Sequence, residues 1–263
     1  MLIRKAIEIL RKDGFDGLAK RLKRRISLGL MKKSSATTVT HKEAMKYFEI
    51  FKDDYDRLIS AIYPYVSSDS IILDIGANIG YFTFLLAERL NFNGSVYLFE
   101  PVPHLAALCR ATFRDVPFGV NVFDFGLSDR DAEEDMFIAV DGNIGWNTIV
   151  PQWASGMTKI RIQLKSFDAC EIEVTPHLIK IDVEGAEYRV LRGMLGSLRK
   201  WHNLPIILCE VAGGKSHPAW ESEMSVFMEM EEIGYTICDL GGSPIDVAIL
   251  QETTDVLFIP RKQ

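Results

Sequence analysis

The clearest hydrophobic pattern in the chain is a short apolar run that stops at a glycine turn. Residues 71 to 75 read Ile-Ile-Leu-Asp-Ile and lead directly into Gly-Ala-Asn-Ile-Gly at 76 to 80. The run is too short for a core helix and lacks the alternation of a half-exposed strand, which is typical of a central parallel strand covered on both faces. Because open α/β sheets bind ligands at such strand ends, the pattern predicts a buried strand that delivers a ligand-binding loop.

The same strand and helix periods recur along the rest of the chain. Short apolar runs predict further strands at 95–99, 120–123, 177–182, 205–209, 235–238 and 255–259. Helical spacing of apolar residues predicts helices at 41–62, 81–90, 105–113, 190–198 and 220–232. A capping-box pattern at Thr40 to Glu43 opens the first of these helices. The alternation predicts an α/β fold with seven main strands and helices on both faces.

Residues 130 to 168 interrupt this alternation. Apolar runs at 136–140 and 160–164, with an Asp-Gly-Asn turn at 141 to 143, predict hairpin-like strands inserted before the sheet resumes. The stretch Gly-Trp-Asn-Thr at 145 to 148 mixes polar and aromatic residues in a way that suits a substrate wall. A buried Trp146 without a ligand fits the same pattern equally well.

Composition favours one full-sized domain. The 263 residues are 48% apolar, enough to bury a core, and no apolar stretch approaches the roughly 20 residues that span a bilayer. The N-terminus lacks the features of a signal peptide, and the four widely spaced cysteines indicate neither a zinc site nor a disulfide framework. We therefore expect a cytoplasmic protein with reduced cysteines.

Charge is unevenly distributed along the chain. Residues 1–33 hold 11 Lys and Arg against three acidic residues, whereas the remainder has 19 basic against 33 acidic residues, a net charge of −14. Apolar residues at near-helical spacing make 1–33 a basic amphipathic arm. Such an arm can lie on the inner membrane surface or dock a protein partner, and it can equally pack on its own domain. Nucleic-acid binding is disfavoured, because the body is acidic and no aromatic residues interleave the basic ones.

A second cofactor signal follows the next predicted strand, where Glu100 falls 20 positions after Gly80. A carboxylate there can accept hydrogen bonds from both hydroxyls of a ribose. The spacing also suits a nicotinamide dinucleotide, but a dinucleotide loop has a glycine where this chain has Asn78, and Asp74 would oppose a pyrophosphate. An acidic loop favours a cationic ligand. We therefore predict S-adenosylmethionine as the cofactor, bound through Asp74, Gly76, Asn78, Gly80 and Glu100.

Polar residues also follow three other predicted strands. Ser128 and Asp129, just past the third strand, could meet an adenine or form an ordinary turn. Asp182 stands at the end of the fourth strand, with Lys180 on the same face because side chains alternate along a strand. Glu210 ends the fifth strand in the same way. This pattern predicts a cation behind carboxylates at the edge of the cleft.

With these residues assembled, the chain resembles the FkbM family of class I S-adenosylmethionine-dependent methyltransferases, chiefly O-methyltransferases that act on sugars and natural products. Four blocks carry the resemblance in order and spacing. They are Leu-Asp-Ile-Gly-Ala-Asn-Ile-Gly at 73–80, Phe-Glu-Pro at 99–101, Lys-Ile-Asp-Val-Glu-Gly-Ala-Glu at 180–187 with Leu-Arg-Gly at 191–193, and Glu210 with the late Gly-Tyr at 234–235. The third block is the one specific to this family.

The resemblance implies a Rossmann-like class I methyltransferase fold, with a mostly parallel seven-stranded sheet, a reversed final strand and a β-hairpin insertion. It implies a cofactor across the first two strand ends and an acceptor above the fourth and fifth. The expected division is a basic arm at 1–33, a linker and capping helix at 34–66, and a methyltransferase domain at 67–263 with the insertion at 130–168. Relatives often place a histidine shortly after the glutamate that ends the fifth strand, whereas Val-Ala-Gly-Gly follows Glu210 here, so we expect no catalytic histidine there.

These expectations together describe O-methylation of a hydroxyl on a saccharide or natural-product acceptor. Asp182 is the leading candidate for a general base or acceptor contact, Glu184 and Glu210 come next, and Lys180 would orient their charge. Alternatively, Asp182 contacts the cofactor, Glu184 and Glu187 complement the start of a helix, and Lys180 is a structural ion-pair partner. We expect no metal, although closely spaced acids can hold a divalent ion.

Two rival functions stay open at this point. They are a nicotinamide-dependent dehydrogenase and a non-catalytic protein that binds an adenosyl ligand. The remaining histidines do not change the picture, because they are scattered and each is expected to be a surface or capping residue. Those considered are His104, His177 and His217.

Overall fold

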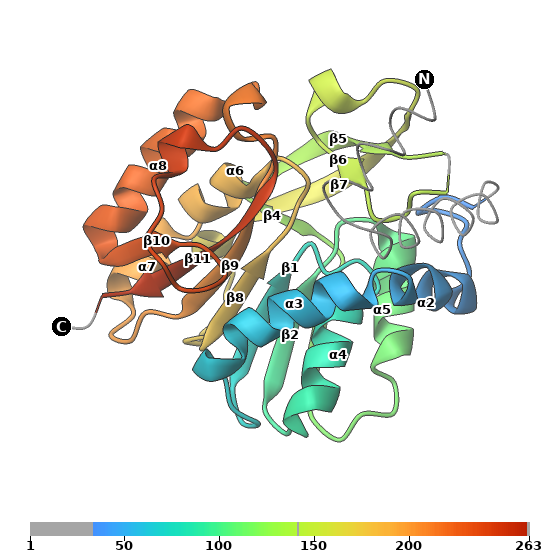
Figure 1. Ribbon diagram of the computed structural model, residues 1–263. Helices are drawn as coiled ribbons and strands as arrows, with labels where there is room; N and C mark the ends of the chain where they lie inside the picture. The colour runs from blue at the N-terminus through green and yellow to red at the C-terminus, as the bar shows by residue number, and fades with distance from the viewer. Residues whose placement is uncertain (1–33, 141, 262–263) are drawn as a thin grey trace, which may run out of the picture.

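The structure is a computed structural model that describes residues 34–140 and 142–261. The predicted basic arm at 1–33 and Asp141 of the predicted turn lie outside the described residues. Within the two described ranges, none of the helices combines the length and apolar character needed to cross a membrane. A large central sheet is flanked by helices, and a smaller sheet is set over one end of it (Figure 1).

The central sheet has seven strands in the order β10-β11-β9-β8-β1-β2-β3. Their bounds are β1 (Ile71–Ile75), β2 (Ser95–Phe99), β3 (Gly119–Phe123), β8 (Leu178–Ile181), β9 (Ile206–Val211), β10 (Tyr235–Cys238) and β11 (Thr254–Pro260). Neighbours from β9 to β3 pair in parallel, whereas β11 runs antiparallel to β9 and to β10. The predicted mostly parallel sheet with one reversed strand is confirmed. The chain changes direction across the sheet at β1 and β8, which makes their ends the topological switch point where such folds bind ligands.

Both faces of the central sheet are buried, as the apolar runs predict. Ile72 joins one core cluster and Leu73 the other, because successive side chains of a strand point to opposite faces. Helices α3 (Lys52–Ile62), α4 (Tyr81–Leu90) and α5 (Pro103–Thr112) pack on the Ile72 face. Helices α6 (Glu187–Arg192), α7 (Leu195–Lys200) and α8 (Trp220–Ile233) pack on the Leu73 face. The remaining short helical turns are η1 (Tyr63–Tyr65), η2 (Pro151–Trp153), η3 (Phe167–Ala169), η4 (Gly214–Ser216) and η5 (Val247–Ile249).

The helix predicted over 41–62 is divided in two. It forms α2 (His41–Glu49) and α3, with the break at Ile50 and Phe51. The predicted capping box is present, because the Thr40 side chain accepts from the Glu43 N–H while the Glu43 carboxylate accepts from the Thr40 N–H. The break lets the two short helices follow the rim of the central sheet (Figure 1).

The helix predicted over 190–198 is also divided, at Gly193, between α6 and α7. A Cβ at Gly193 would lie 1.9 Å from the backbone oxygen of Ser128, so the two backbones are in direct contact there. Such an approach requires glycine. Hydrophobic spacing continues across this point, which is why the spacing alone predicts one helix.

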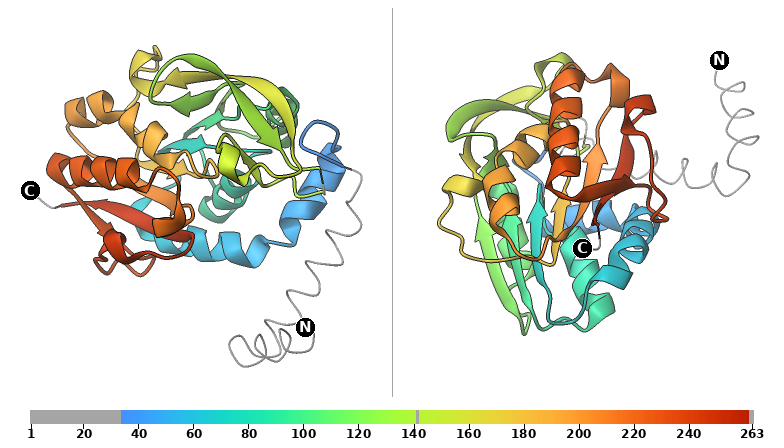
Figure 2. Two further views of the ribbon diagram at one scale, coloured as in Figure 1. Left: turned by 90° about the horizontal axis from the view of Figure 1, so that it is seen from above. Right: turned by 90° about the vertical axis from the view of Figure 1, so that its left-hand side faces the viewer.

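The inserted hairpin is confirmed and belongs to a second sheet. This sheet has the order β4-β7-β5-β6, with β4 (Gly126–Ser128), β5 (Ala132–Ile138), β6 (Asn147–Thr148) and β7 (Thr158–Ser166). Strands β5 and β7 form the antiparallel pair. Seen from above, the second sheet lies over the ends of the central strands (Figure 2). The insertion therefore covers the edge at which the central sheet presents its polar residues.

Candidate active site

The turn after β1 has a left-handed backbone at three positions. Gly76, Asn78 and Gly80 have φ angles of 79°, 53° and 78°. A Cβ at Gly76 would lie 1.8 Å from the backbone oxygen of Asp182, so a larger residue does not fit there. Glycine and asparagine adopt these angles at least cost. The local sequence thus explains how the chain bends between β1 and α4 and brings its backbone to the end of β8.

Glu100, which follows β2, contacts this turn directly. Its Oε2 accepts a hydrogen bond from the backbone N–H of Asn78 at 2.9 Å, and its Oε1 accepts one from Val102 at 2.8 Å. The side chain is buried, and burial raises the pKa of Glu100 to about 7. Each carboxyl oxygen has two lone pairs, so each keeps one for a further donor. Glu100 can therefore hold the turn and accept ribose hydroxyls at the same time.

Lys180 joins the carboxylates of two neighbouring strands. Its Nζ lies 3.1 Å from Oδ2 of Asp182 and 3.5 Å from Oδ1 of Asp74, and it donates to the backbone oxygen of Gly76 at 3.3 Å. Burial opposes the charge of Lys180, but the carboxylates of Asp182 and Asp74 outweigh burial and raise its pKa. Asp74 is completely buried and also accepts a hydrogen bond from Thr83. It supports the turn from behind, whereas Asp182 lines the cavity in front.

Three carboxylates meet at the ends of β8 and β9. One oxygen each from Asp182, Glu184 and Glu210 lie within 4.8 Å of one another. Burial raises the pKa of Glu210 to about 9, and the nearby Asp182 adds to the rise. Burial also raises the pKa of Glu184 well above its usual range, with further contributions from Asp182 and Glu210. Glu210 therefore favours the protonated form at neutral pH and can donate a hydrogen bond, and the environment of Glu184 shifts that carboxyl group in the same direction, beside the ion pair of Asp182 and Lys180.

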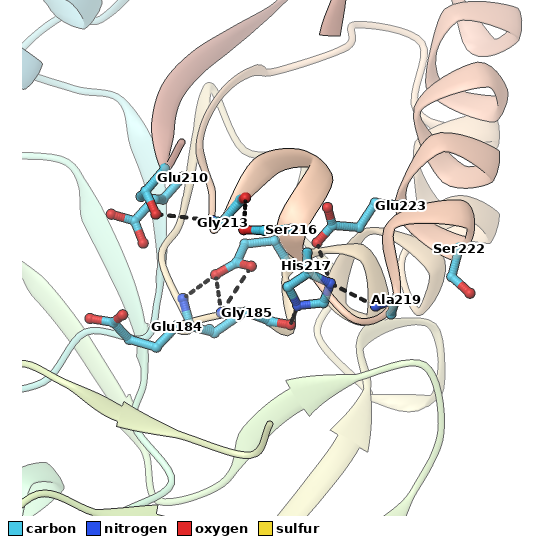
Figure 3. Close-up of polar contacts among 12 residues, drawn as sticks. Glu184, Gly185, Glu210, Gly213, Ser216, His217, Ala219, Ser222 and Glu223 are labelled. Atoms are coloured by element: carbon cyan, nitrogen blue, oxygen red, sulfur yellow. Dashed lines mark hydrogen bonds and ion pairs between the residues drawn. The ribbon is translucent and has the colours of Figure 1, made fainter. Parts of the chain in front are cut away.

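Glu184 lies in a turn whose backbone is hydrogen-bonded to side chains from distant parts of the chain. Oγ1 of Thr148, in the second sheet, donates to the backbone oxygen of Glu184 at 2.6 Å. Nε2 of His217, just after η4, lies 2.9 Å from the backbone oxygen of Gly185. Figure 3 shows the carboxylates of Glu184 and Glu210 on one side of this turn and the His217 ring on the other.

A cavity of about 540 Å³ opens in front of the three carboxylates. Aromatic side chains from α2, α3, α4 and the insertion form much of its wall, namely Tyr47, Phe48, Phe51, Tyr55, Tyr81, Phe82 and Trp146. A narrower cavity of about 60 Å³ adjoins it under the second sheet, and Glu100 lines that one. Gly76, Asn78 and Asp182 line both. Apolar walls with a few convergent polar groups are the usual construction of a small-molecule site.

The structure gathers most of the predicted site residues at these two cavities. Those that line one or both are Gly76, Asn78, Glu100, Lys180, Asp182, Glu184 and Glu210. Gly80 packs behind the turn, where a Cβ would meet the Phe113 ring at 2.3 Å, and Asp74 lies behind it as well. The roles assigned to all of these residues stay predictions.

Ser128 and Asp129 lie elsewhere. The Ser128 hydroxyl donates to Asp129, whose carboxylate accepts from Arg189 at 3.0 Å. Gly126 and Leu127 line the narrower cavity in this part of the chain. The physical reason is that β4 belongs to the second sheet, so the residues after it turn towards α6 and away from the end of the central sheet.

His217 differs from the expectation for a surface residue. It is buried, burial lowers its pKa, and its ring packs against Trp153 with the ring centres 5.0 Å apart. The other expected role, that of a capping residue, agrees better with the structure. Nδ1 of His217 accepts a hydrogen bond from the N–H of Ala219, the residue directly before α8. No sequence signal pointed to its contact with Gly185, which lies 32 positions away.

The strand order, the glycine turn and the acidic strand ends define a Rossmann-like α/β protein with a nucleoside-cofactor type of site. The chain belongs to the methyltransferase FkbM domain family, whose model matches residues 74–237. That match covers the turn, Glu100 and all three clustered carboxylates.

Two curated relatives are similar to parts of the chain. Hexuronic acid methyltransferase AglP of Haloferax volcanii is 26% identical over 155 residues, which cover 56% of this chain and 57% of that protein. AMB antimetabolite synthetase AmbE of Pseudomonas aeruginosa is 35% identical over 88 residues, which cover 34% of this chain and 4% of that protein. The chain thus spans little more than half of the first relative and a small part of the second.

Solved structures of methyltransferases are similar at low identity. A putative rRNA methylase from Clostridium thermocellum has a TM-score of 0.49 at 10% identity, over 81% of this chain and 96% of that one. An O-methyltransferase from Bacillus cereus in complex with SAH has a TM-score of 0.46 at 12% identity, over 78% of this chain and 79% of that one.

Proposed function

We propose that this protein transfers the methyl group of S-adenosylmethionine to a hydroxyl of a saccharide or natural-product acceptor, with a saccharide as the first choice. The observation that carries the proposal is the meeting of Asp182, Glu184 and Glu210 at the wall of a cavity whose lining combines aromatic rings with other charged and amide side chains. Carboxyl groups bind sugar hydroxyls, and aromatic rings pack against the apolar faces of sugar rings. Membership of the FkbM family supports the methyl-transfer part, and the similarity to a hexuronic acid methyltransferase supports the saccharide part.

The residues around the turn fit the proposed cofactor. Gly76 leaves the space that a Cβ would fill, so the backbone can approach a ligand closely. Oδ1 of Asn78 is buried and has no hydrogen-bond partner among the described residues, which leaves an acceptor available at the cavity. Glu100 offers two acceptors for ribose hydroxyls. The acidic surroundings suit a cation, and S-adenosylmethionine carries a sulfonium that makes its methyl group transferable.

The carboxyl groups would receive the acceptor. Asp182 would accept the proton of the reacting hydroxyl or orient that hydroxyl, and Lys180 would keep the Asp182 side chain in place through their 3.1 Å contact. Glu184 and Glu210 would hold neighbouring hydroxyls. Orientation can contribute about 7 to 11 kcal/mol to such a reaction, whereas a general base contributes about 10² to 10⁴-fold in rate. Placement of the acceptor is therefore the larger part of the proposed catalysis.

The acceptor can be larger than one sugar. A second hollow of about 400 Å³ adjoins the main cavity, and Arg57 and Asp255 line both. The side chains of these two residues form an ion pair with a 2.8 Å contact between the cavities. Two threonines and Asp239 complete a polar lining that suits further hydroxyl groups. We therefore favour an oligosaccharide or a glycosylated product over a free monosaccharide.

The proposal is tested by transfer of labelled methyl groups to a panel of acceptors. The panel contains neutral and uronate-bearing oligosaccharides, the matching monosaccharides and phenolic natural products. We expect label in an ether-linked methyl of an oligosaccharide, and Asp182→Asn should lower turnover at least about tenfold while changing cofactor affinity less. Cofactor binding without transfer to any member would instead favour the non-catalytic alternative. No binding of S-adenosylmethionine by the native protein would reject the proposal.

A further inference from the structure

The turn that carries Glu184 has an unusual backbone. Glu184 has a φ of 55°, and Gly185 after it has a φ of 101°. A residue with a Cβ is disfavoured in the left-handed region, and such strain persists where the surroundings over-determine the conformation. Strain of this kind gathers at functional sites. The carboxyl group of Glu184 is one of the three that meet at the cavity.

Three buried side chains hold this turn, two from distant parts of the chain and one, Glu187, from the start of α6 directly after it. Thr148 donates to the backbone oxygen of Glu184, and it also accepts from the N–H of Val150, which fixes the direction of its hydroxyl proton. The Glu187 carboxylate accepts from the N–H of Gly185 through both of its oxygens. The bonds to Glu184 and Gly185 engage the backbone of the turn, so they set its shape. The Glu184 side chain takes no part in them and remains free to face the cavity.

His217 completes this set of contacts. The N–H of Ala219 donates to Nδ1 at 3.0 Å, so Nδ1 is the acceptor nitrogen and Nε2 carries the proton. Nε2 therefore donates to the backbone oxygen of Gly185 at 2.9 Å. Figure 3 shows His217 behind the turn, on the side away from the Glu184 carboxylate. A histidine in this place does not touch the acceptor cavity.

We infer that Thr148, Glu187 and His217 form a backbone clamp that forces Glu184 into a left-handed conformation and thereby aims its carboxyl group at the acceptor. They are positioning residues for the reaction. The inference rests on the proposed function for its catalytic part, whereas the clamp itself is a property of the fold. Its physical basis is that the side chains of Thr148, Glu187 and His217 together satisfy the backbone hydrogen-bonding groups of the turn. Without these bonds, residue 184 would leave the left-handed conformation.

The catalytic part is tested with matched substitutions. Thr148→Val keeps the shape of the side chain and removes its donor, whereas Thr148→Ser keeps the donor. His217→Gln can still donate to Gly185 and accept from Ala219, whereas His217→Phe cannot. We expect Thr148→Val and His217→Phe each to lower kcat by about 10 to 100-fold with little change in cofactor Kd, and the two conservative variants to retain most of the wild-type kcat.

A double-mutant comparison shows whether the clamp acts through Glu184. In a Glu184→Ala background, Thr148→Val should lower kcat by less than about twofold, because the group it positions has already been removed. Equal losses in the two backgrounds would overturn the positioning role. A loss in kcat that is as large in the conservative variants Thr148→Ser and His217→Gln would do the same.

The clamp itself is tested without any acceptor. Glu184→Gly and Glu184→Ala both remove the carboxyl group, but only glycine relieves the left-handed strain. We expect Glu184→Gly to melt about 2 to 4 °C above Glu184→Ala in the otherwise native chain. That advantage should vanish or reverse when Thr148→Val and His217→Phe are also present, because alanine is then free to leave the left-handed region. The same Tm for Gly and Ala in the native chain would reject the clamp, even if methyl transfer is demonstrated, and a clear advantage would support it even if the acceptor is never found.

Discussion

Lys180 and Asp74 are register partners on β8 and β1, and the Lys180 ammonium lies 3.5 Å from an Asp74 oxygen that is completely buried. That oxygen, Oδ1, has no hydrogen bond among the described residues, so the ion pair with Lys180 offsets the free-energy cost of burying its charge. The pair lies directly behind the glycine turn, because Lys180 also donates to the backbone oxygen of Gly76. Stability of the fold and the shape of the glycine turn therefore depend on the same lysine.

Lys180→Met should lower the free energy of unfolding by about 3 to 5 kcal/mol, because it leaves the Asp74 carboxylate buried without a counter-charge. Asp74→Asn in the same chain should restore part of the loss, since a neutral amide needs no counter-charge. Chemical denaturation of the two single variants and the double variant measures the coupling. Losses that simply add in the double variant would contradict an ion pair between these residues.

Glu100→Ala should weaken binding of S-adenosylmethionine about tenfold or more, because it removes the proposed ribose acceptor and the bond to the Asn78 N–H together. Titration calorimetry measures the affinity directly. Glu88→Ala is a suitable control, since Glu88 is an exposed residue of α4 that lines neither cavity, and the affinity of this variant should equal that of the wild type. Equal affinities for wild type and Glu100→Ala would remove Glu100 from the site.

Local pattern was sufficient for the strand, turn and helix at 71 to 90. The apolar run, the two glycines and Asn78 each constrain the backbone within a few residues of themselves, so their consequences can be predicted without the rest of the chain. The same holds for Lys180 and Asp182, because strand alternation puts them on one face and their side chains do form an ion pair. Parallel strand ends meet at one edge of the sheet, which is why Asp182 and Glu210 could be predicted to be neighbours.

Contacts between distant segments could not be predicted in this way. Thr148 and His217 meet at one turn only because the second sheet and the segment after β9 fold back over β8. The hydrophobic periodicity of a segment does not indicate which distant segment it will contact. The surroundings of Ser128 and Asp129 could not be derived from strand order either, since β4 pairs with β7 of the second sheet and not with the strands of the central one, and their contact with an adenine stays a prediction.

Removal of divalent cations should leave methyl transfer within about twofold of the untreated enzyme. The three clustered carboxyl oxygens are close enough to hold an ion, but divalent ions bind ionised oxygens. Burial raises the pKa of Glu210 to about 9 and also raises the pKa of Glu184, which disfavours the ionised form of both, and Lys180 already pairs with Asp182. Turnover in the presence of a chelator checks this. Activity that is lost on chelation and restored by Mg²⁺ would show that a metal belongs to the site.

Glu223 on α8 should make the protein less stable as the pH rises. Its Oε1 lies 3.4 Å from Nδ1 of His217, and its Oε2 is buried without a hydrogen bond among the described residues. Burial, with a smaller contribution from Glu187, raises the pKa of Glu223 from 4.5 to about 8. The folded state therefore favours the protonated acid. Its contribution to stability is fully present below pH 4.5 and is lost as the pH rises through about 8.

Glu223→Gln keeps the size of the side chain and removes the ionisation, so the variant should escape this loss. We expect the Tm of Glu223→Gln relative to wild type to increase by at least about 2 to 4 °C between pH 5 and pH 8.5. Glu221→Gln, at an exposed position of the same helix, is the matched control and should show the same difference from wild type at both pH values. A Tm difference for Glu223→Gln that does not change with pH would mean that Glu223 ionises in the folded protein as readily as in the unfolded chain, and that its buried surroundings tolerate a charge.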